Sequence, residues 1–170
     1  MQRFRCVAIE TETAARWRAS GQDDRGQALH RRIVDGPSFP CRYCLELGKP
    51  GEVMLLGSYA LPHPQGVYGA PSPIFLHERA CARFEAADEI APIVLAKGIV
   101  SVRSYDAAEM CLYDLGAVSE GPEVAPLLAR AVADPRARFI NIHTARPGCL
   151  LCRVEKADCD AGDAPKAGAT

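Results

Sequence analysis

The sequence has no hydrophobic run long enough to cross a membrane. Its longest apolar stretch, residues 90–102, is interrupted by Lys97 and Gly98, whereas a spanning helix needs about 20 apolar residues. The first ten residues, MQRFRCVAIE, contain no apolar segment of the kind found in secretory signal peptides. We therefore do not expect a membrane-bound or exported protein, and the predicted location is the cytoplasm.

An excess of charge of either sign is also missing. The 170 residues include 20 lysines and arginines and 21 aspartates and glutamates, which leaves a formal net charge of -1. Proteins that bind nucleic acids or anionic membranes usually carry a basic excess. We therefore expect neither nucleic acid nor membrane as a partner, and a small-molecule ligand remains a candidate.

Several familiar functional patterns are absent too. The chain contains no phosphate-binding loop, no Gly-x-Gly-x-x-Gly and no Ser-His-Asp order, so a nucleotide-binding protein or a hydrolase has no support. What the chain does contain is eight cysteines. Without a secretory signal these thiols should stay reduced, so metal binding, reactivity or burial explains them better than disulfides.

Alternating apolar residues and turn signals predict an α+β fold. We expect a single globular domain at residues 1–155, with a mainly antiparallel sheet of about six to seven short strands and two to four flanking helices. The predicted strands are residues 4–9, 53–61, 74–77, 99–106, 110–118, 139–145 and 149–155. The predicted helices are residues 11–20, 23–34, 78–89 and a segment from about Pro122 to Asp134. Residues 156–170 offer almost nothing to bury and predict a disordered tail.

The segment CRYC carries the clearest candidate site. Cys41 and Cys44 have the spacing at which two thiolates in a tight turn bind one tetrahedral ion. His77 and Cys81 are four residues apart, and in a helical turn they would lie on one face. The sequence therefore predicts a structural zinc site formed by Cys41, Cys44, His77 and Cys81.

Other interpretations of these residues stay open. Cys41 or Cys44 can act as a nucleophile in a thiol enzyme, with His77 or His143 as proton carrier. The same cysteines can also be ordinary buried thiols, since free cysteine is among the most buried residue types. An interaction module without any chemistry is a further alternative, and it would require an exposed apolar patch.

Polar residues on two predicted strands suggest a small-anion site. Alternation places Arg103 and Tyr105 on one face of their strand, and His143 shares a face with Asn141 on another. Such a cluster can line a pocket in which arginines hold an anionic group. The competing interpretation, which we favour, is a solvated face of the sheet. The candidate ligand-binding residues are Arg42, Arg103, Tyr105, His143 and Arg146.

The remaining cysteines receive simpler assignments. Cys149 and Cys152 also have Cys-x-x-Cys spacing, but residues i and i+3 of a strand point to opposite faces, so they cannot chelate one ion. Cys6 and Cys111 lie in apolar strand contexts and are predicted core residues. Cys159 falls in the predicted tail and is expected to be exposed.

Four ordered segments resemble one family. They are PCRYCL at residues 40–45, PIFLHERAC at 73–81, VRSYD at 102–106 and NIHTARPGCLLCRV at 141–154. In this order and spacing they are similar to the uncharacterised bacterial family called domain of unknown function 1203. The chain departs from that pattern at Ser72, where a glycine is expected. The resemblance implies that the four predicted metal ligands belong to family-defining segments, and it brings no activity, substrate or cofactor.

Overall fold

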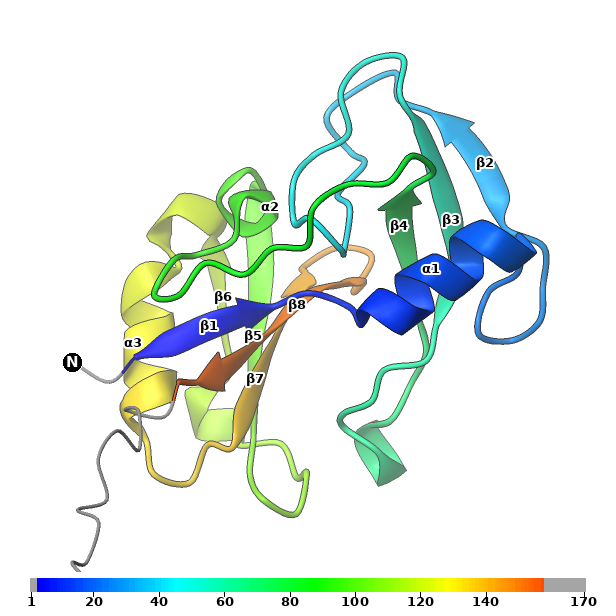
Figure 1. The fold of residues 1–170 in the computed structure, drawn as a ribbon. Coiled ribbons are helices and arrows are strands. Elements are labelled where there is room, and N and C mark those ends of the chain that lie inside the picture. The colour runs from blue at the N-terminus through cyan, green and yellow to red at the C-terminus, as the bar shows by residue number, and fades with distance from the viewer. Residues whose placement is uncertain (1–2, 158–170) are drawn as a thin grey trace, which may run out of the picture.

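Eight strands pair into two antiparallel sheets in the computed structural model, which describes residues 3–157 (Figure 1). The larger sheet has the order β1-β8-β7-β5-β6 and the smaller sheet the order β2-β3-β4. The larger sheet contains β1 (Phe4–Val7), β5 (Ile99–Tyr105), β6 (Ala117–Glu120), β7 (Phe139–Thr144) and β8 (Leu150–Lys156). The smaller sheet contains β2 (His30–Ile33), β3 (Val53–Tyr59) and β4 (Ser72–His77). The prediction of one antiparallel α+β domain is confirmed, but the strands form two sheets and are more numerous than expected.

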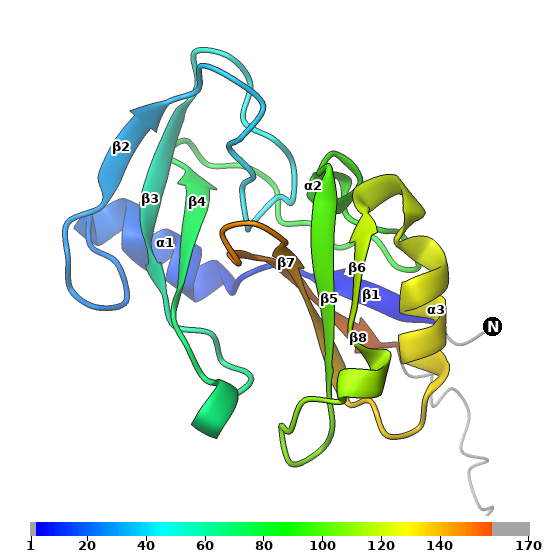
Figure 2. The same ribbon diagram turned by 180° about the vertical axis from the view of Figure 1, so that it is seen from behind.

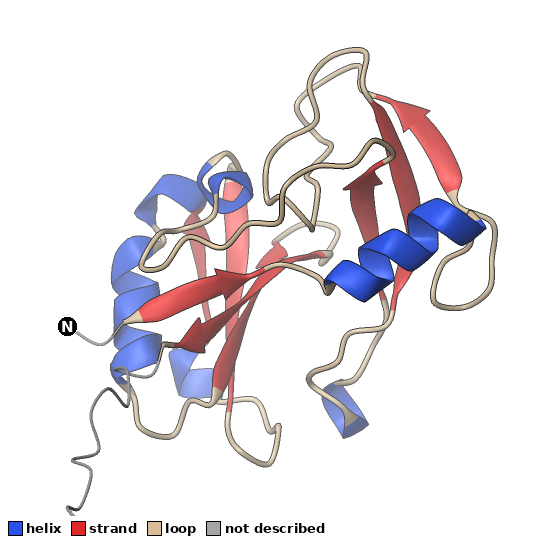
Figure 3. Ribbon diagram, viewed as in Figure 1, coloured by secondary structure: helices blue, strands red, loops and turns tan. Residues whose placement is uncertain are grey.

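Three short helices in the described part of the chain lie outside the sheets. They are α1 (Thr11–Ser20), α2 (Pro92–Leu95) and α3 (Ala125–Ala133), and single 3-10 turns occur at Gly66–Tyr68, Tyr113–Leu115 and Gly121–Glu123. No helix within residues 3–157 has the length and apolar character that a membrane span requires. Figure 3 shows that long loops rather than helices run between the two sheets, formed by residues 34–52 and 78–91.

The larger sheet and α3 enclose one hydrophobic core. Alternate residues of the central strands, among them Val102, Ile140 and Ile142, turn toward the helix and are at most 2% exposed. Leu128 and Val132, one helical turn apart on α3, are buried in the same cluster. The helix therefore packs on the sheet because its apolar stripe and the alternating strand residues meet (Figures 1 and 2).

The smaller sheet packs against α1. Trp17 of this helix is fully buried, and it faces Gly57 of β3. A Cβ atom at Gly57 would lie 3.0 Å from the Trp17 ring and 2.4 Å from a methyl group of Leu29. Only a glycine at this position lets the tryptophan lie directly on the sheet.

The predicted helix over residues 23–34 is wrong, because this segment forms a loop followed by strand β2. The Asp23 carboxylate accepts backbone N–H hydrogen bonds from Arg25, Gln27 and Ser58. A side chain that satisfies backbone donors in this way stabilises a turn at the expense of helix.

The predicted helix over residues 78–89 is also wrong, because the segment is extended and irregular. Its backbone donors find partners in distant elements: Glu78 N–H donates to Val53, Phe84 N–H donates to Tyr43, and Asp88 N–H donates to Phe4. Arg83 adds hydrogen bonds from its side chain to two carbonyl groups of residues 8 and 9. Tertiary hydrogen bonds therefore replace those that a helix would make internally.

Two further predictions need adjustment at their edges. The predicted strand 110–118 is interrupted by the 3-10 turn Tyr113–Leu115, and of this segment only the part in β6 forms a ladder with β5. Lys156, assigned to the predicted tail, is the last residue of β8. The rest of that predicted tail from residue 158 on, including Cys159, lies outside the described residues.

Candidate metal centre

The loop of residues 39–48 folds into a tight, hairpin-like turn that presents two cysteines. Gly48 N–H donates to Phe39 O at 2.8 Å, and Cys41 N–H donates to Glu46 O at 2.9 Å. The chain reverses at Leu45, whose φ of 54° lies in the left-handed region. Inside the turn, the backbone N–H groups of Cys44 and Glu46 point at the sulfurs of Cys41 and Cys44, respectively. Both cysteine sulfurs therefore lie on the inner side of the turn, among backbone donors that favour thiolates.

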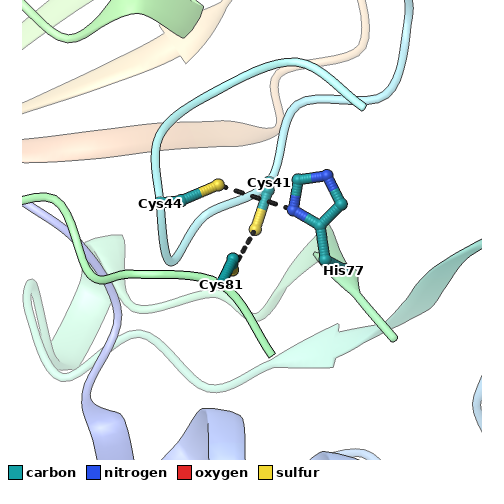
Figure 4. Close-up of side chains that lie close together, drawn as sticks. All are labelled: Cys41, Cys44, His77 and Cys81. Carbon is teal, nitrogen blue, oxygen red and sulfur yellow. Dashed lines mark hydrogen bonds between the residues drawn. The ribbon is translucent and has the colours of Figure 1, made fainter. Parts of the chain in front are cut away.

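Three chain segments bring four ligand atoms together (Figure 4). Cys41 and Cys44 come from the turn, His77 is the last residue of β4, and Cys81 lies in the extended segment that follows. One ligand atom from each residue lies within 4.8 Å of all the others. The predicted grouping of these residues is confirmed, although His77 and Cys81 lie on a strand end and a loop and not on one helical turn.

Two distances within the cluster are close to those of a tetrahedral site. With bonds of about 2.3 Å to sulfur and about 2.1 Å to nitrogen, two sulfurs are about 3.8 Å apart and a sulfur and a nitrogen about 3.6 Å apart. The sulfurs of Cys41 and Cys81 are 4.0 Å apart, and Cys44 Sγ is 3.4 Å from His77 Nδ1. Small adjustments of side chains thus suffice for this group to hold a metal ion such as zinc.

Electrostatics in the cluster favours a negative sulfur next to a positive ring. Hydrogen bonds from the thiols of Cys44 and Cys81 lower the pKa of Cys41. The hydrogen bonds of Cys44 to Cys41 and Cys81 raise the pKa of Cys44, and burial and the charge of Cys41 raise it further. Hydrogen bonds to the sulfurs of Cys41 and Cys81 raise the pKa of His77 to about 10. A divalent cation bound among these groups would displace their protons, since zinc binds thiolate and neutral imidazole.

Two residues that the sequence analysis missed support the cluster from outside. Glu52 Oε2 lies 3.3 Å from His77 Nε2, so a carboxylate faces the ring nitrogen that points away from the sulfurs. Arg18 of α1 donates from Nε to the His77 carbonyl group at 3.0 Å and from Nη2 to Cys81 Sγ at 3.4 Å. No short-range pattern links either residue to its partner in the cluster, because β3 and β4 separate Glu52 from the His77 ring, and several strands separate Arg18 from His77 and Cys81.

The candidate anion-binding residues divide into two places. Arg103, Tyr105 and His143 share one face of the larger sheet, whereas Arg42 and Arg146 line a cleft near the turn between β7 and β8. Arg42 is buried, and its Nε donates to Leu150 O at 2.6 Å. The five residues therefore do not form one pocket.

The preferred interpretation of that sheet face as solvated is wrong. Tyr105 and His143 are buried, at 4% and 6% exposure. The segment between β3 and β4 crosses this face: Asn141 donates to the His63 carbonyl group at 3.1 Å, and the rings of Tyr68 and Tyr105 meet edge-on. Tyr105, Asn141 and His143 are thus interior residues under a loop, and Arg103 is half-buried beside them.

The other cysteines agree in part with expectation. Cys152 is buried in the same hydrophobic core as Cys6, whereas Cys149 lines the cleft of Arg42. The two cysteines of this second Cys-x-x-Cys thus occupy different surroundings, as predicted. Cys6 is a core residue, and Cys111 is half-buried.

A family model matches residues 38–156, which include the four clustered residues. Its description is "Protein of unknown function (DUF1203)". The chain belongs to this family. A search of the curated proteins finds no match, and neither does a search of the solved structures.

Proposed function

We propose that Cys41, Cys44, His77 and Cys81 bind a structural zinc ion in this DUF1203 protein. The observation that carries the proposal is the convergence of three thiols and one imidazole within 4.8 Å. Three cysteines and a histidine are a common ligand set of structural zinc, and a site with four protein ligands leaves no position for a substrate.

The ion would connect three segments of the chain, two of which are loops without regular secondary structure. The turn of residues 39–48, the end of β4 and the segment around Cys81 meet at the cluster, and the last of these leads on to α2 in the other half of the molecule (Figure 1). Each of these loops carries a large cost in conformational entropy when it is ordered. Metal binding offsets that cost, because its free energy becomes available only when the loops fold together.

The surroundings of His77 fit a metal ligand. Metal-bound histidines usually donate their second ring N–H to a carboxylate or carbonyl group, which holds the ring in orientation. Glu52 provides such a carboxylate at Nε2 and is itself held by the Lys49 backbone N–H at 2.7 Å. This arrangement leaves Nδ1, on the side of Cys44, for the ion.

The test is metal analysis of protein purified without a histidine tag. We expect one zinc per chain in the unaltered protein, and loss of zinc in Cys44→Ser and in Cys81→Ser. Cys111→Ser is the matched control, because Cys111 is also half-buried but lies outside the cluster. Absence of stoichiometric zinc, together with unchanged thermal stability after chelation, would refute the proposal.

The alternative of a thiol enzyme is distinguished from a zinc site by the reactivity of Cys44 and Cys81. An enzyme of this kind needs a thiol that is alkylated abnormally fast near neutral pH. A zinc site predicts the reverse: Cys44 and Cys81 are alkylated slowly in the zinc-loaded protein and rapidly after chelation. Rapid alkylation of either residue with zinc bound would favour the enzyme.

A further inference from the structure

A second polar site lies at the junction of the two sheets. Figures 1 and 2 show the turn between β7 and β8 lying between β4 and α2. A cleft of about 490 Å³ opens here, lined by residues from the turn, from β4 and from the end of α2. This volume falls in the range of about 300 to 1,000 Å³ that is typical of small-molecule sites.

The lining of the cleft is charged with one sign only. Arg42, Lys97 and Arg146 contribute three cationic groups, and none of the described residues that line the cleft is acidic. The lining also contains the hydroxyl groups of Ser38 and Thr144. The three cations and Ser38 can donate hydrogen bonds into the cleft, which suits an oxyanion with several acceptor oxygens, while the Thr144 hydroxyl donates to the Cys149 carbonyl group.

Arg42 is the unusual member of this group. It is 3% exposed, and its guanidinium donates to two neutral acceptors, the carbonyl groups of Leu150 and Pro40. Its guanidinium carries a positive charge at neutral pH, as arginine does throughout proteins. Charged side chains this deeply buried are normally paired with an opposite charge. Among residues 3–157, no ion pair involves Arg42.

Lys97 adds a second charge that is poorly compensated. It is half-buried at the end of α2 and forms no ion pair within the described part of the chain. Burial and the charge of Arg42 both lower its pKa. Two like charges that are held near each other outside bulk water repel, so an anion between them would relieve an unfavourable interaction.

From this geometry we infer that the cleft binds the phosphate or carboxylate group of a small molecule. Arg42 and Lys97 hold the anionic group at the inner end, and Arg146, on the exposed turn, closes over the outer end. The Cys149 thiol lies in the same lining and provides a reporter for occupancy. The site is separate from the zinc cluster, with which the cleft shares no lining residue.

The experiment uses inorganic phosphate as the probe on the full-length protein as purified. Iodoacetamide alkylation of Cys149 is followed by peptide mass spectrometry, with Cys111 as the internal reference. We expect phosphate to slow alkylation of Cys149 in a saturable way and to leave Cys111 unaffected. Sodium chloride at matched ionic strength should have no such effect.

Variants locate the effect in the cleft. Lys97→Met removes one cation from the lining, and we expect it to weaken phosphate binding at least about tenfold, as the loss of one charge-assisted hydrogen bond would. Arg32→Met is the matched control, because it removes one charge from an exposed arginine on β2 outside the cleft. Equal protection by sodium chloride, or equal weakening in both variants, would overturn the inference.

A parallel series with succinate distinguishes the two chemistries. Protection by phosphate alone indicates a phosphorylated ligand, and protection by succinate that also depends on Lys97 indicates an organic acid. No protection by either probe in protein that retains its fold would overturn the inference, whatever the outcome of the metal analysis.

Discussion

Cys41 and Leu45 lie only four residues apart but are buried in different hydrophobic cores. Cys41 belongs to the core of the smaller sheet, and Leu45 belongs to the core of the larger sheet. Both side chains are 0% exposed. The tight turn between them therefore connects the two halves of the molecule, and the proposed zinc ion lies on this connection.

Replacement of Leu45 by alanine tests this connection. The change removes a fully buried side chain from the larger core and leaves a cavity, so the free energy of unfolding should fall by about 2–5 kcal/mol. Urea unfolding measures the difference. The control is Leu95→Ala, since Leu95 is 41% exposed and its loss should cost only about 0.5 kcal/mol. Equal losses in both variants would show that Leu45 does not contribute to the connection.

Removal of the metal should loosen the turn before it loosens the larger sheet. The backbone N–H groups of Ile9, Phe84 and Ile93 donate to carbonyl groups of residues 42–45. After chelation we expect these three amides to exchange with solvent markedly faster, because the turn that accepts their hydrogen bonds opens locally. Amides of the β5–β7 ladder serve as the internal control. Hydrogen exchange that is unchanged at all three amides would contradict a structural role of the metal.

Glu52 should tune the zinc affinity without being a ligand. In Glu52→Gln the carboxylate that faces His77 is replaced by a neutral amide, and partners of this kind typically contribute 10- to 100-fold in metal affinity, so we expect a loss of about that size. Competition with a chromophoric chelator measures it. Glu46→Gln is the matched control, because Glu46 is an exposed carboxylate near the cluster. The same zinc affinity in both variants would argue against a role for Glu52.

Acid should destabilise the protein partly through His143. Burial lowers the pKa of this residue from 6.5 to about 4, assisted by the charges of Arg103 and Arg42. Its Nδ1 lies 2.9 Å from the Gly148 carbonyl oxygen, and its buried Nε2 has no hydrogen-bond partner among residues 3–157, so the neutral ring is the form that fits. Between pH 6.5 and 4 the unfolded chain binds a proton that the folded protein does not, and stability falls as the pH falls.

The expected loss over this range is about 3 kcal/mol, at 1.36 kcal/mol for each pKa unit. Urea unfolding at pH 7, 5.5 and 4.5 should show a steeper decline for the unaltered protein than for His143→Gln. The difference between the two slopes isolates His143 from the other acid-sensitive groups, including the cysteine cluster. Parallel slopes would mean that His143 takes up its proton equally in the folded and unfolded states, against a lowered pKa in the folded protein.

The four cysteine-cluster residues could be predicted from the sequence because the signal is local. A Cys-x-x-Cys pair and a His-x-x-x-Cys pair each place two metal-binding groups within one short segment. The helical turn predicted for the second pair is nevertheless wrong, since His77 ends a strand and Cys81 lies in a loop. The extended conformation of residues 78–89 depends on hydrogen bonds to Val53, Tyr43 and Phe4, and no short segment contains that information.

Only some residues of the cleft could be predicted from the sequence. The sequence predicts Arg42 and Arg146 as residues that hold an anion, but it wrongly groups Arg103 and Tyr105 with them. Strand alternation identifies which face of the sheet a residue lies on, but not which segment covers that face. The only feature of the sequence that marks Lys97 is its position within an otherwise apolar stretch. Arg42 and Lys97 come from separate parts of the chain, and they line the same cleft only because the turn of residues 39–48 and the end of α2 come together in the folded protein.

The amino-acid sequence by itself determined the antiparallel α+β character, helix α1, most strand positions and the four residues of the proposed metal site. These features follow from periodicity and side-chain chemistry, which act over a few residues. The division into two sheets, the covering of the polar face and the meeting of Glu52 with His77 were decided by tertiary structure. They depend on which distant backbone and side-chain groups satisfy one another once the chain is compact, and burial makes an unsatisfied polar group costly.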